Sequence, residues 1–218
     1  MKYYEIMKSN PIPNFEVMRD DWIDSKLGKF SLFGFQVYVG KQGSGKTMAA
    51  VRDLIAIKKK YPKAIVVCNV DLLNVDFKWI QFKTPDELET VLRSINNGED
   101  GVIYFIDEIH NYFNSLDSKN IPIWVFQEIS QQRKQRKLII ATSQLFLRVA
   151  KPLREQADNI IDVKAYLGYL QVMRVYDGWS ISTDENDNIV STRKAIRYFW
   201  QSNETRHCYD TLQRIFAT

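Results

Sequence analysis

Along residues 34–144, short apolar runs take turns with longer segments in which apolar and polar residues are mixed. Short runs that are almost wholly apolar predict four buried strands: "FQVYV", "AIVVCNV", "VIYFIDE" and "LIIATSQ". Between these runs, apolar residues recur every three or four positions over 46–60, 84–98 and 124–136, which predicts amphipathic helices. Strands that alternate with helices are typical of a mostly parallel sheet with helices on both faces. The sequence therefore predicts an α/β fold for this part of the chain.

The predicted helix at 84–98 also carries signals for its start and its end. Thr84 stands at the N-cap and Pro85 at the first helical position, and Glu87 completes a capping box with Thr84. Gly98 follows the last apolar position of the pattern, so we expect the helix to stop there.

The residues on either side of this region follow other patterns. Residues 1–33 are rich in aromatic side chains and predict an N-terminal arm that packs on the sheet or on a neighbouring subunit. Three runs after residue 158 predict further strands, with a turn around "DENDN". We therefore expect a core at 34–165 and, in the same domain, a β-rich extension at 166–218 that ends in a helix. The aromatic residues of the arm are Tyr3, Tyr4, Trp22 and Phe30.

Composition limits the class of protein. A chain of 218 residues suits one domain, and its 45% of apolar and 26% of charged residues exclude a disordered or fibrous protein. The apolar runs are far shorter than the ~20 residues of a membrane helix, and the start lacks a signal peptide, so we expect a soluble, intracellular protein with no membrane span. Two cysteines are too few for a disulfide framework. The net charge of +4 permits a polyanionic partner without requiring one.

The stretch "GKQGSGKT" at 40–47 predicts a phosphate-binding loop, because it lies directly between a strand and a helix. Gly40 and Gly45 allow backbone N–H groups to wrap phosphates at the start of the helix. Lys46 would reach the β- and γ-phosphates of ATP, and the Thr47 hydroxyl would bind Mg²⁺. The expected nucleotide-binding residues are Gly40, Lys41, Gln42, Gly43, Ser44, Gly45, Lys46 and Thr47.

Three polar residues at the ends of later strands complete the expected site, because parallel strands present their carboxyl ends to the same edge of a sheet. Asp107 would hold Mg²⁺, and Glu108 would polarise a water for attack on the γ-phosphate. If the strand at 138–144 lies between the first and third strands, the Gln144 amide faces the γ-phosphate. The alternatives are a solvated carboxylate at Glu108 and a loop amide at Gln144 that caps nearby backbone.

These motifs also carry a resemblance to known proteins. "GKQGSGKT", "YFIDE", "ATSQ", "LR" at 153–154 and "YDT" at 209–211 resemble the FtsK-HerA superfamily of P-loop ATPases. Within it, the sequence is most similar to viral genome-packaging ATPases and to the ATPase domain of Zot-like phage proteins. The resemblance implies a P-loop NTPase fold of the RecA/ASCE type and a ring of identical subunits that moves DNA by ATP hydrolysis. Zot-like proteins are typically followed by a membrane segment and an exported part; neither is visible in this chain, which favours the packaging type.

Two arginines in "RKQRK" at 133–137 are candidates for a role between subunits. A strand of about six residues at roughly 3.3 Å each places Arg133 and Arg136 about 20 Å from the edge that carries Gln144. Neither easily serves its own nucleotide, so we expect one of them, Arg136 first, to act as an arginine finger at a neighbour's site, as the resemblance also implies. The alternative is a basic helix end that favours its own dipole. Arg148 and Arg154 are reserve candidates.

The expected function is therefore an ATP-hydrolysing motor with Mg²⁺ that works as a pentameric or hexameric ring on double-stranded DNA and packages a viral genome. Further expected partners are a viral capsid vertex or a membrane protein, and the expected location is the host cytoplasm or the virion. Lys119 in the loop at 114–120 is a candidate DNA contact, with a solvated turn as the alternative. Nothing marks His110 or His207 as a ligand.

Three other functions remain open. A Zot-like ATPase would drive phage assembly or export, and it would not need DNA for its turnover. A nucleotide-gated switch or a small-molecule kinase would use the same loop, although the chain lacks the guanine-reading Asn-Lys-x-Asp pattern. A scaffold would bind ATP without hydrolysing it.

Overall fold

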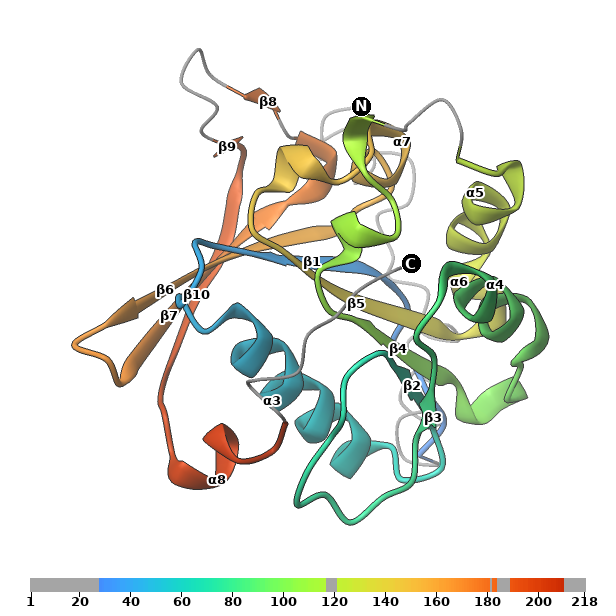
Figure 1. The fold of residues 1–218 in the computed structure, drawn as a ribbon, viewed down its shortest axis with the longest axis horizontal. Helices are drawn as coiled ribbons and strands as arrows, with labels where there is room; N and C mark the ends of the chain where they lie inside the picture. The colour runs from blue at the N-terminus through green and yellow to red at the C-terminus, as the bar shows by residue number, and fades with distance from the viewer. Residues whose placement is uncertain (1–27, 117–120, 181, 184–188, 210–218) are drawn as a thin grey trace, which may run out of the picture.

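In the computed structural model, residues 28–116, 121–180, 182–183 and 189–209 are described, and they form one large sheet flanked by helices (Figure 1). The strands of the large sheet are β1 (Gly34–Val39), β2 (Ile65–Cys68), β3 (Ile80–Gln81), β4 (Val102–Ile106), β5 (Lys137–Ser143), β6 (Asn159–Tyr166), β7 (Leu170–Asp177) and β10 (Arg193–Trp200). Their spatial order is β10-β7-β6-β1-β5-β4-β2-β3. β8 (Ser182–Thr183) and β9 (Ile189–Val190) pair separately.

Strands β6, β1, β5, β4, β2 and β3 are parallel to one another, so their carboxyl ends meet at one edge of the sheet. β5 lies between β1 and β4, with Val39 beside Ser143 and Ile106 beside Ala141. The predicted α/β fold with a mostly parallel sheet and the predicted place of the fourth strand are both confirmed.

Helices cover both faces of the sheet (Figure 1). α3 packs on one face, in a buried cluster with apolar residues of β1, β2 and β5. α4 and α5 pack on the other face, in a second buried cluster that also holds Leu153. The helices are α3 (Lys46–Lys60), α4 (Pro85–Ser94), α5 (Ile123–Ser130), α6 (Gln132–Gln135), α7 (Lys151–Arg154) and α8 (Asn203–Arg206).

Two predicted helices differ from the structure at their ends. α4 begins with the predicted capping box, but it stops at Ser94 because Ile95 is extended (φ −85°, ψ 118°). Gly98 instead opens a short 3₁₀ turn. The helix predicted over 124–136 is divided into α5 and α6, because the backbone of Gln131 (φ −96°, ψ 4°) leaves helical values.

The strands after residue 158 join the same sheet beyond β1. β6 pairs with β1 in parallel, and β7 and β10 follow as antiparallel strands. After β10 the chain runs to the loop that follows β2, where the Leu73 N–H donates to the Cys208 carbonyl and the Asn74 amide donates to the His207 carbonyl. The tail therefore reaches from one side of β1 to the other.

Several sequence predictions fall outside the described residues: most of the arm (1–27), Lys119, the turn at 184–188, and the chain after residue 209. Phe30 of the arm is buried and packs edge-on against Tyr61 at the end of α3. In the ranges that the structure describes, no helix is both long enough and apolar enough to cross a membrane.

Candidate nucleotide-binding site

The loop between β1 and α3 has the backbone that an anion site needs. Gly43 and Gly45 have positive φ angles of 75° and 79°, which residues with a side chain rarely adopt. Gly40 is required for a different reason, since a Cβ there would lie 2.6 Å from the Val163 carbonyl of β6. The N-cap of α3 is Gly45, which has no side chain to occupy the first N–H groups of the helix. Those N–H groups can therefore bind phosphate oxygens.

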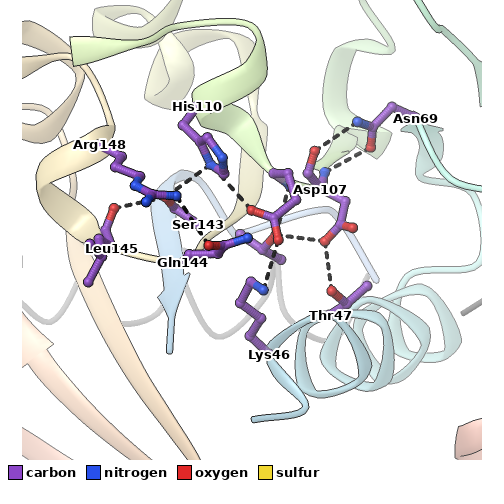
Figure 2. Close-up of polar contacts among 11 residues, drawn as sticks. Lys46, Thr47, Asn69, Asp107, His110, Ser143, Gln144, Leu145 and Arg148 are labelled. Carbon is purple, nitrogen blue, oxygen red and sulfur yellow. Dashed lines mark hydrogen bonds and ion pairs between the residues drawn. The ribbon is translucent and has the colours of Figure 1, made fainter. Parts of the chain in front are cut away.

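Asp107 follows β4 and is held in place from three sides (Figure 2). Its Oδ1 accepts hydrogen bonds from the hydroxyl groups of Thr47 (2.9 Å) and Thr142 (2.6 Å). The Asn69 side chain accepts from the Asp107 N–H at 2.8 Å and donates to the Asp107 carbonyl at 2.9 Å. Burial raises the pKa of the Asp107 carboxyl, and the two hydroxyl donors oppose that shift.

Glu108 turns out of the strand direction toward Lys46. Its backbone is left-handed (φ 51°, ψ 54°), a conformation that costs a residue with a side chain on the order of 1 kcal/mol. The Glu108 N–H donates to the Thr142 hydroxyl, and Glu108 Oε1 lies 2.8 Å from Lys46 Nζ. Both side chains are largely shielded from water, with 8% of Lys46 and 19% of Glu108 exposed. The loop lysine and the second acid thus form one ion pair.

Polar residues after β4 and β5 surround this pair (Figure 2). His110 Nδ1 lies 3.3 Å from Glu108 Oε2 and 3.3 Å from the Ser143 hydroxyl. Burial lowers the pKa of His110, and the Glu108 carboxylate opposes that effect. Gln144 directly follows β5, and its Oε1 accepts a hydrogen bond of 3.2 Å from Arg148. The amide therefore lies at the edge of the sheet where the acids lie.

A cleft of about 690 Å³ opens over the phosphate-binding loop. This volume is within the usual range of small-molecule sites. One wall comes from the loop, the start of α3 and the ends of β2 and β4, and the other comes from the end of β6, the β6–β7 turn and the chain after β10. The lining residues are Gln42, Gly43, Gly45, Lys46, Thr47, Met48, Val70, Asp107, Ala165, Gly168, Gln201, Arg206, His207 and Tyr209.

The extension also supports the loop from behind. Gln171 of β7 is fully buried, and a Cβ at Gly45 would collide with its amide. Among the residues described, neither polar atom of the Gln171 side chain has a hydrogen-bond partner. The loop and the extension are therefore packed in direct contact at Gly45.

The oxygen atoms at the end of β4 suit Mg²⁺. Mg²⁺ prefers hard oxygen ligands and is usually held by one or two carboxylates together with substrate phosphates. Thr47 and Asp107 supply a hydroxyl and a carboxylate that already lie 2.9 Å apart. Within the described ranges, no group of three or more His, Cys, Asp or Glu side chains could hold a metal ion alone. The donors thus fit an ion that arrives with a phosphate.

The two predicted finger arginines lie at the opposite edge of the sheet. Arg133 and Arg136 come just before β5, whose other end leads to Gln144. The Arg136 guanidinium donates to the Phe30 carbonyl at 3.0 Å, and the Arg133 guanidinium lies 5.4 Å from the Phe33 ring centroid. They are therefore remote from the cleft of their own chain, as expected, and a role at a neighbour's site stays a prediction.

The reserve arginines are placed differently. Arg148 contacts Gln144 at the near edge. Arg154 is half-buried over the Phe146 ring, and burial lowers its pKa.

Three residues of the site were not found in the sequence. Asn69 and Thr142 fix Asp107, and His110 contacts Glu108. Asn69 follows β2 as Asp107 follows β4, so the rule that parallel strands end at one edge would have found it. Thr142 lies inside a strand that is buried throughout, and only the three-dimensional arrangement marks it.

The fold is that of a P-loop NTPase. A glycine loop joins a strand to a helix that begins with Lys46 and Thr47, and two acids follow the parallel strand opposite them. Residues 35–194 match the family model described as zonular occludens toxin (Zot), so the chain belongs to the Zot family. No curated protein sequence matches the chain.

Solved structures have the same fold. The N-terminal domain of zonular occludens toxin from Neisseria meningitidis is similar with a TM-score of 0.54 and 14% identity, over 81% of this chain and 98% of that chain. The genome packaging NTPase B204 of Sulfolobus turreted icosahedral virus 2, in complex with ATP-gammaS, is similar with a TM-score of 0.53 and 13% identity, over 72% of this chain and 95% of that chain. At these identities the likeness shows the fold. Both of the expected resemblances, to Zot-like proteins and to packaging ATPases, are confirmed.

Proposed function

We propose that this protein hydrolyses ATP with Mg²⁺, and that hydrolysis drives a ring of identical subunits along double-stranded DNA. One observation carries the proposal: Lys46 pairs with Glu108, and Thr47 contacts Asp107, directly after a glycine loop at the edge of the sheet. A binding loop alone would serve many nucleotide-binding proteins. A second carboxylate, placed next to the metal-binding one and paired with the loop lysine, suits the activation of a water.

The residues would divide the chemistry as follows. The N–H groups of the loop and Lys46 bind the β- and γ-phosphates, so that Lys46 exchanges Glu108 for phosphate oxygens. The released Glu108 carboxylate orients a water and accepts its proton during attack on the γ-phosphate. The Gln144 amide donates a hydrogen bond to the γ-phosphate, so its contacts differ between the ATP-bound and the ADP-bound site. Bound at Thr47 and Asp107, Mg²⁺ would neutralise charge on the β- and γ-phosphates.

A neighbouring subunit would complete the site. Arg136, or else Arg133, lies at the edge of the sheet opposite its own cleft, so we expect it to act at the cleft of the next subunit in a ring. An arginine supplied in trans stabilises charge in the transition state and accelerates phosphoryl transfer by about 10³ to 10⁵. We expect a pentamer or a hexamer.

The family match favours a second candidate, an ATPase that drives phage assembly or export. Residues 35–194 belong to the Zot family, whereas the likeness to a genome packaging NTPase is one of fold. An export ATPase would act on a membrane protein, and a packaging motor on DNA and a capsid vertex. The packaging role places the protein in the host cytoplasm or on the virion. Stimulation of phosphate release by duplex DNA separates the two.

The test is phosphate release by the purified protein, with and without duplex DNA, over a series of protein concentrations. Turnover per subunit is expected to rise with protein concentration, because a shared site forms only in the ring. Lys46→Ala should abolish ATP binding, and Lys58→Ala, at the far end of the same helix, should leave it unchanged. ATP binding without phosphate release at any protein concentration would identify a scaffold. Phosphate release at the same rate with and without duplex DNA would favour the export ATPase.

Mixed rings test the arginine. Lys46→Ala subunits and Arg136→Ala subunits should each be inactive alone. In a ring that contains both variants, an Arg136→Ala subunit has an intact phosphate-binding loop, and its Lys46→Ala neighbour supplies Arg136. ATPase activity should therefore return when the two variants are mixed. Because Arg136 donates to the Phe30 carbonyl, the melting temperature of each variant is compared first. A mixture of folded variants with no gain in activity contradicts a finger at Arg136, and the same experiment then applies to Arg133.

A further inference from the structure

The cleft continues beyond the part that the triphosphate would occupy. Lys46, Asp107 and Glu108 fix the position of the γ-phosphate at the ends of β1 and β4. The other wall is formed by Ala165 near the end of β6, by Gly168 of the β6–β7 turn, and by the chain after β10, which supplies Gln201, Arg206, His207 and Tyr209. We expect the sugar and base of a nucleotide held by the loop to lie against that wall, because the residues at the strand ends bind the phosphates.

Arg206 is a cation of this wall that makes three side-chain hydrogen bonds. Its Nε and Nη2 donate to the Gln201 Oε1 at 2.9 and 2.7 Å, and Nη2 also donates to the Gly168 carbonyl at 2.9 Å. The guanidinium carbon lies 5.7 Å from the centroid of the Tyr169 ring. The hydrogen bonds engage only the edge of the guanidinium, so a face of the group can still stack on a base.

The tail that carries Arg206 is tied down on the far side of the cleft. The Cys208 carbonyl accepts from the Leu73 N–H at 2.8 Å, the His207 carbonyl accepts from the Asn74 amide at 3.0 Å, and Tyr209 forms an antiparallel bridge with Leu72. The wall is therefore anchored at both ends, at Gln201 by β10 and at Tyr209 by the loop after β2. It has the fixed position that a binding surface requires.

We propose that this wall is the nucleoside subsite of the cleft, and that the Arg206 guanidinium stacks on the purine base of the bound nucleotide. The proposal rests on the proposed function only in that the phosphates of the same ligand bind at Lys46. A stacking surface recognises the face of the base and not its edge, so it does not distinguish adenine from guanine, and it favours a purine because the two fused rings offer a larger face than a pyrimidine. The ligand class is a purine nucleoside triphosphate.

Two ligands that differ only in the nucleoside test the proposal. ATP and inorganic tripolyphosphate are titrated into the full-length protein in the presence of Mg²⁺, and Kd is measured by calorimetry. Arg206→Ala is expected to raise the Kd for ATP about tenfold, which is the range of a cation–π contact, and to leave the Kd for tripolyphosphate within about twofold. The matched control is Arg193→Ala, which removes an exposed arginine from the opposite end of β10 and should change neither Kd.

A conservative variant separates stacking from charge. Arg206→Lys keeps the positive charge and a hydrogen-bond donor for the Gly168 carbonyl but lacks the planar face, so it should weaken ATP binding nearly as much as Arg206→Ala. Arg206→Lys with wild-type affinity for ATP overturns the proposal. An equal loss of affinity for both ligands in Arg206→Ala also overturns it, because Arg206 would then bind phosphate.

The proposed function fails in a different way. If Lys46→Ala leaves the binding of both ligands unchanged, the phosphates do not bind at the loop, whatever the Arg206 variants show.

Discussion

Glu108→Gln tests the competition between Glu108 and ATP for Lys46. In the structure Lys46 Nζ lies 2.8 Å from Glu108 Oε1, and both side chains are largely shielded from water. The same ammonium group is expected to bind the β- and γ-phosphates, so ATP must displace the carboxylate. Glutamine keeps the shape of the side chain and an oxygen that accepts from Lys46, but it removes the negative charge.

The distance sets the scale of the effect. At 2.8 Å and an effective dielectric constant of about 20, the Coulomb attraction between the two charges is about 6 kcal/mol. Phosphate oxygens replace most of this attraction when ATP binds, so only a fraction appears as a change in affinity. We expect Glu108→Gln to bind ATP about tenfold more tightly, which corresponds to about 1.4 kcal/mol. Loss of the general base should lower turnover by about 10² to 10⁴.

The assay combines ATP titration with phosphate release in the presence of Mg²⁺. Glu99→Gln is the matched control, because Glu99 is an exposed carboxylate paired with Lys29 at 3.1 Å, away from the cleft, and its loss should change neither quantity. If Glu108→Gln bound ATP no more tightly than the wild type, the ion pair would not compete with the phosphates. Wild-type turnover in Glu108→Gln would refute its role in hydrolysis.

Three further predictions concern stability. Thr84→Ala removes the capping box of α4 with Glu87 and should lower the free energy of unfolding by about 1 kcal/mol in urea titrations; an unchanged midpoint would contradict the cap. Burial raises the pKa of Cys68 to about 12, whereas the thiol of the unfolded chain ionises near pH 9.0. Above pH 9.0 the unfolded state therefore loses a proton that the folded state keeps, so the free energy of unfolding of the wild type, relative to Cys68→Ala, should fall by about 1.4 kcal/mol per pH unit toward pH 12. A difference that stays constant with pH would refute this. Asp107→Asn should raise the melting temperature of the nucleotide-free protein, because burial raises the pKa of Asp107 and so makes its charged form unfavourable in the folded state. The same variant should lose Mg²⁺-dependent ATP binding. A lower melting temperature would contradict the reasoning.

The sequence predicted the elements whose patterns are local. α3 has the predicted bounds of Lys46 and Lys60, because its apolar positions, its glycine start and its basic last turn all lie within a few residues. β3 was missed, since its two residues are both exposed and show no pattern. The partner of β6 was left open, because its pairing with β1 joins segments about 120 residues apart and no local feature encodes it.

The same division holds for the site. The loop and Asp107 were predicted because one is a contiguous motif and the other follows from the common edge of parallel strands. The ion pair between Lys46 and Glu108 was not predicted, because it depends on the left-handed backbone of Glu108. The wall around Arg206 was also missed, since it exists only after the chain beyond β10 has crossed the cleft.

The contact between Gln171 and Gly45 makes two distant positions depend on each other. A methyl group at 45 needs a smaller residue at 171, and a larger residue at 171 needs the loop to move, so neither position can change freely without the other. A fragment that stopped before β7 would lack Gln171, so we expect it to bind phosphate more weakly than the whole domain. The smallest unit that binds a nucleotide is therefore expected to be longer than the segment 40–144, which contains the predicted nucleotide-binding and catalytic residues.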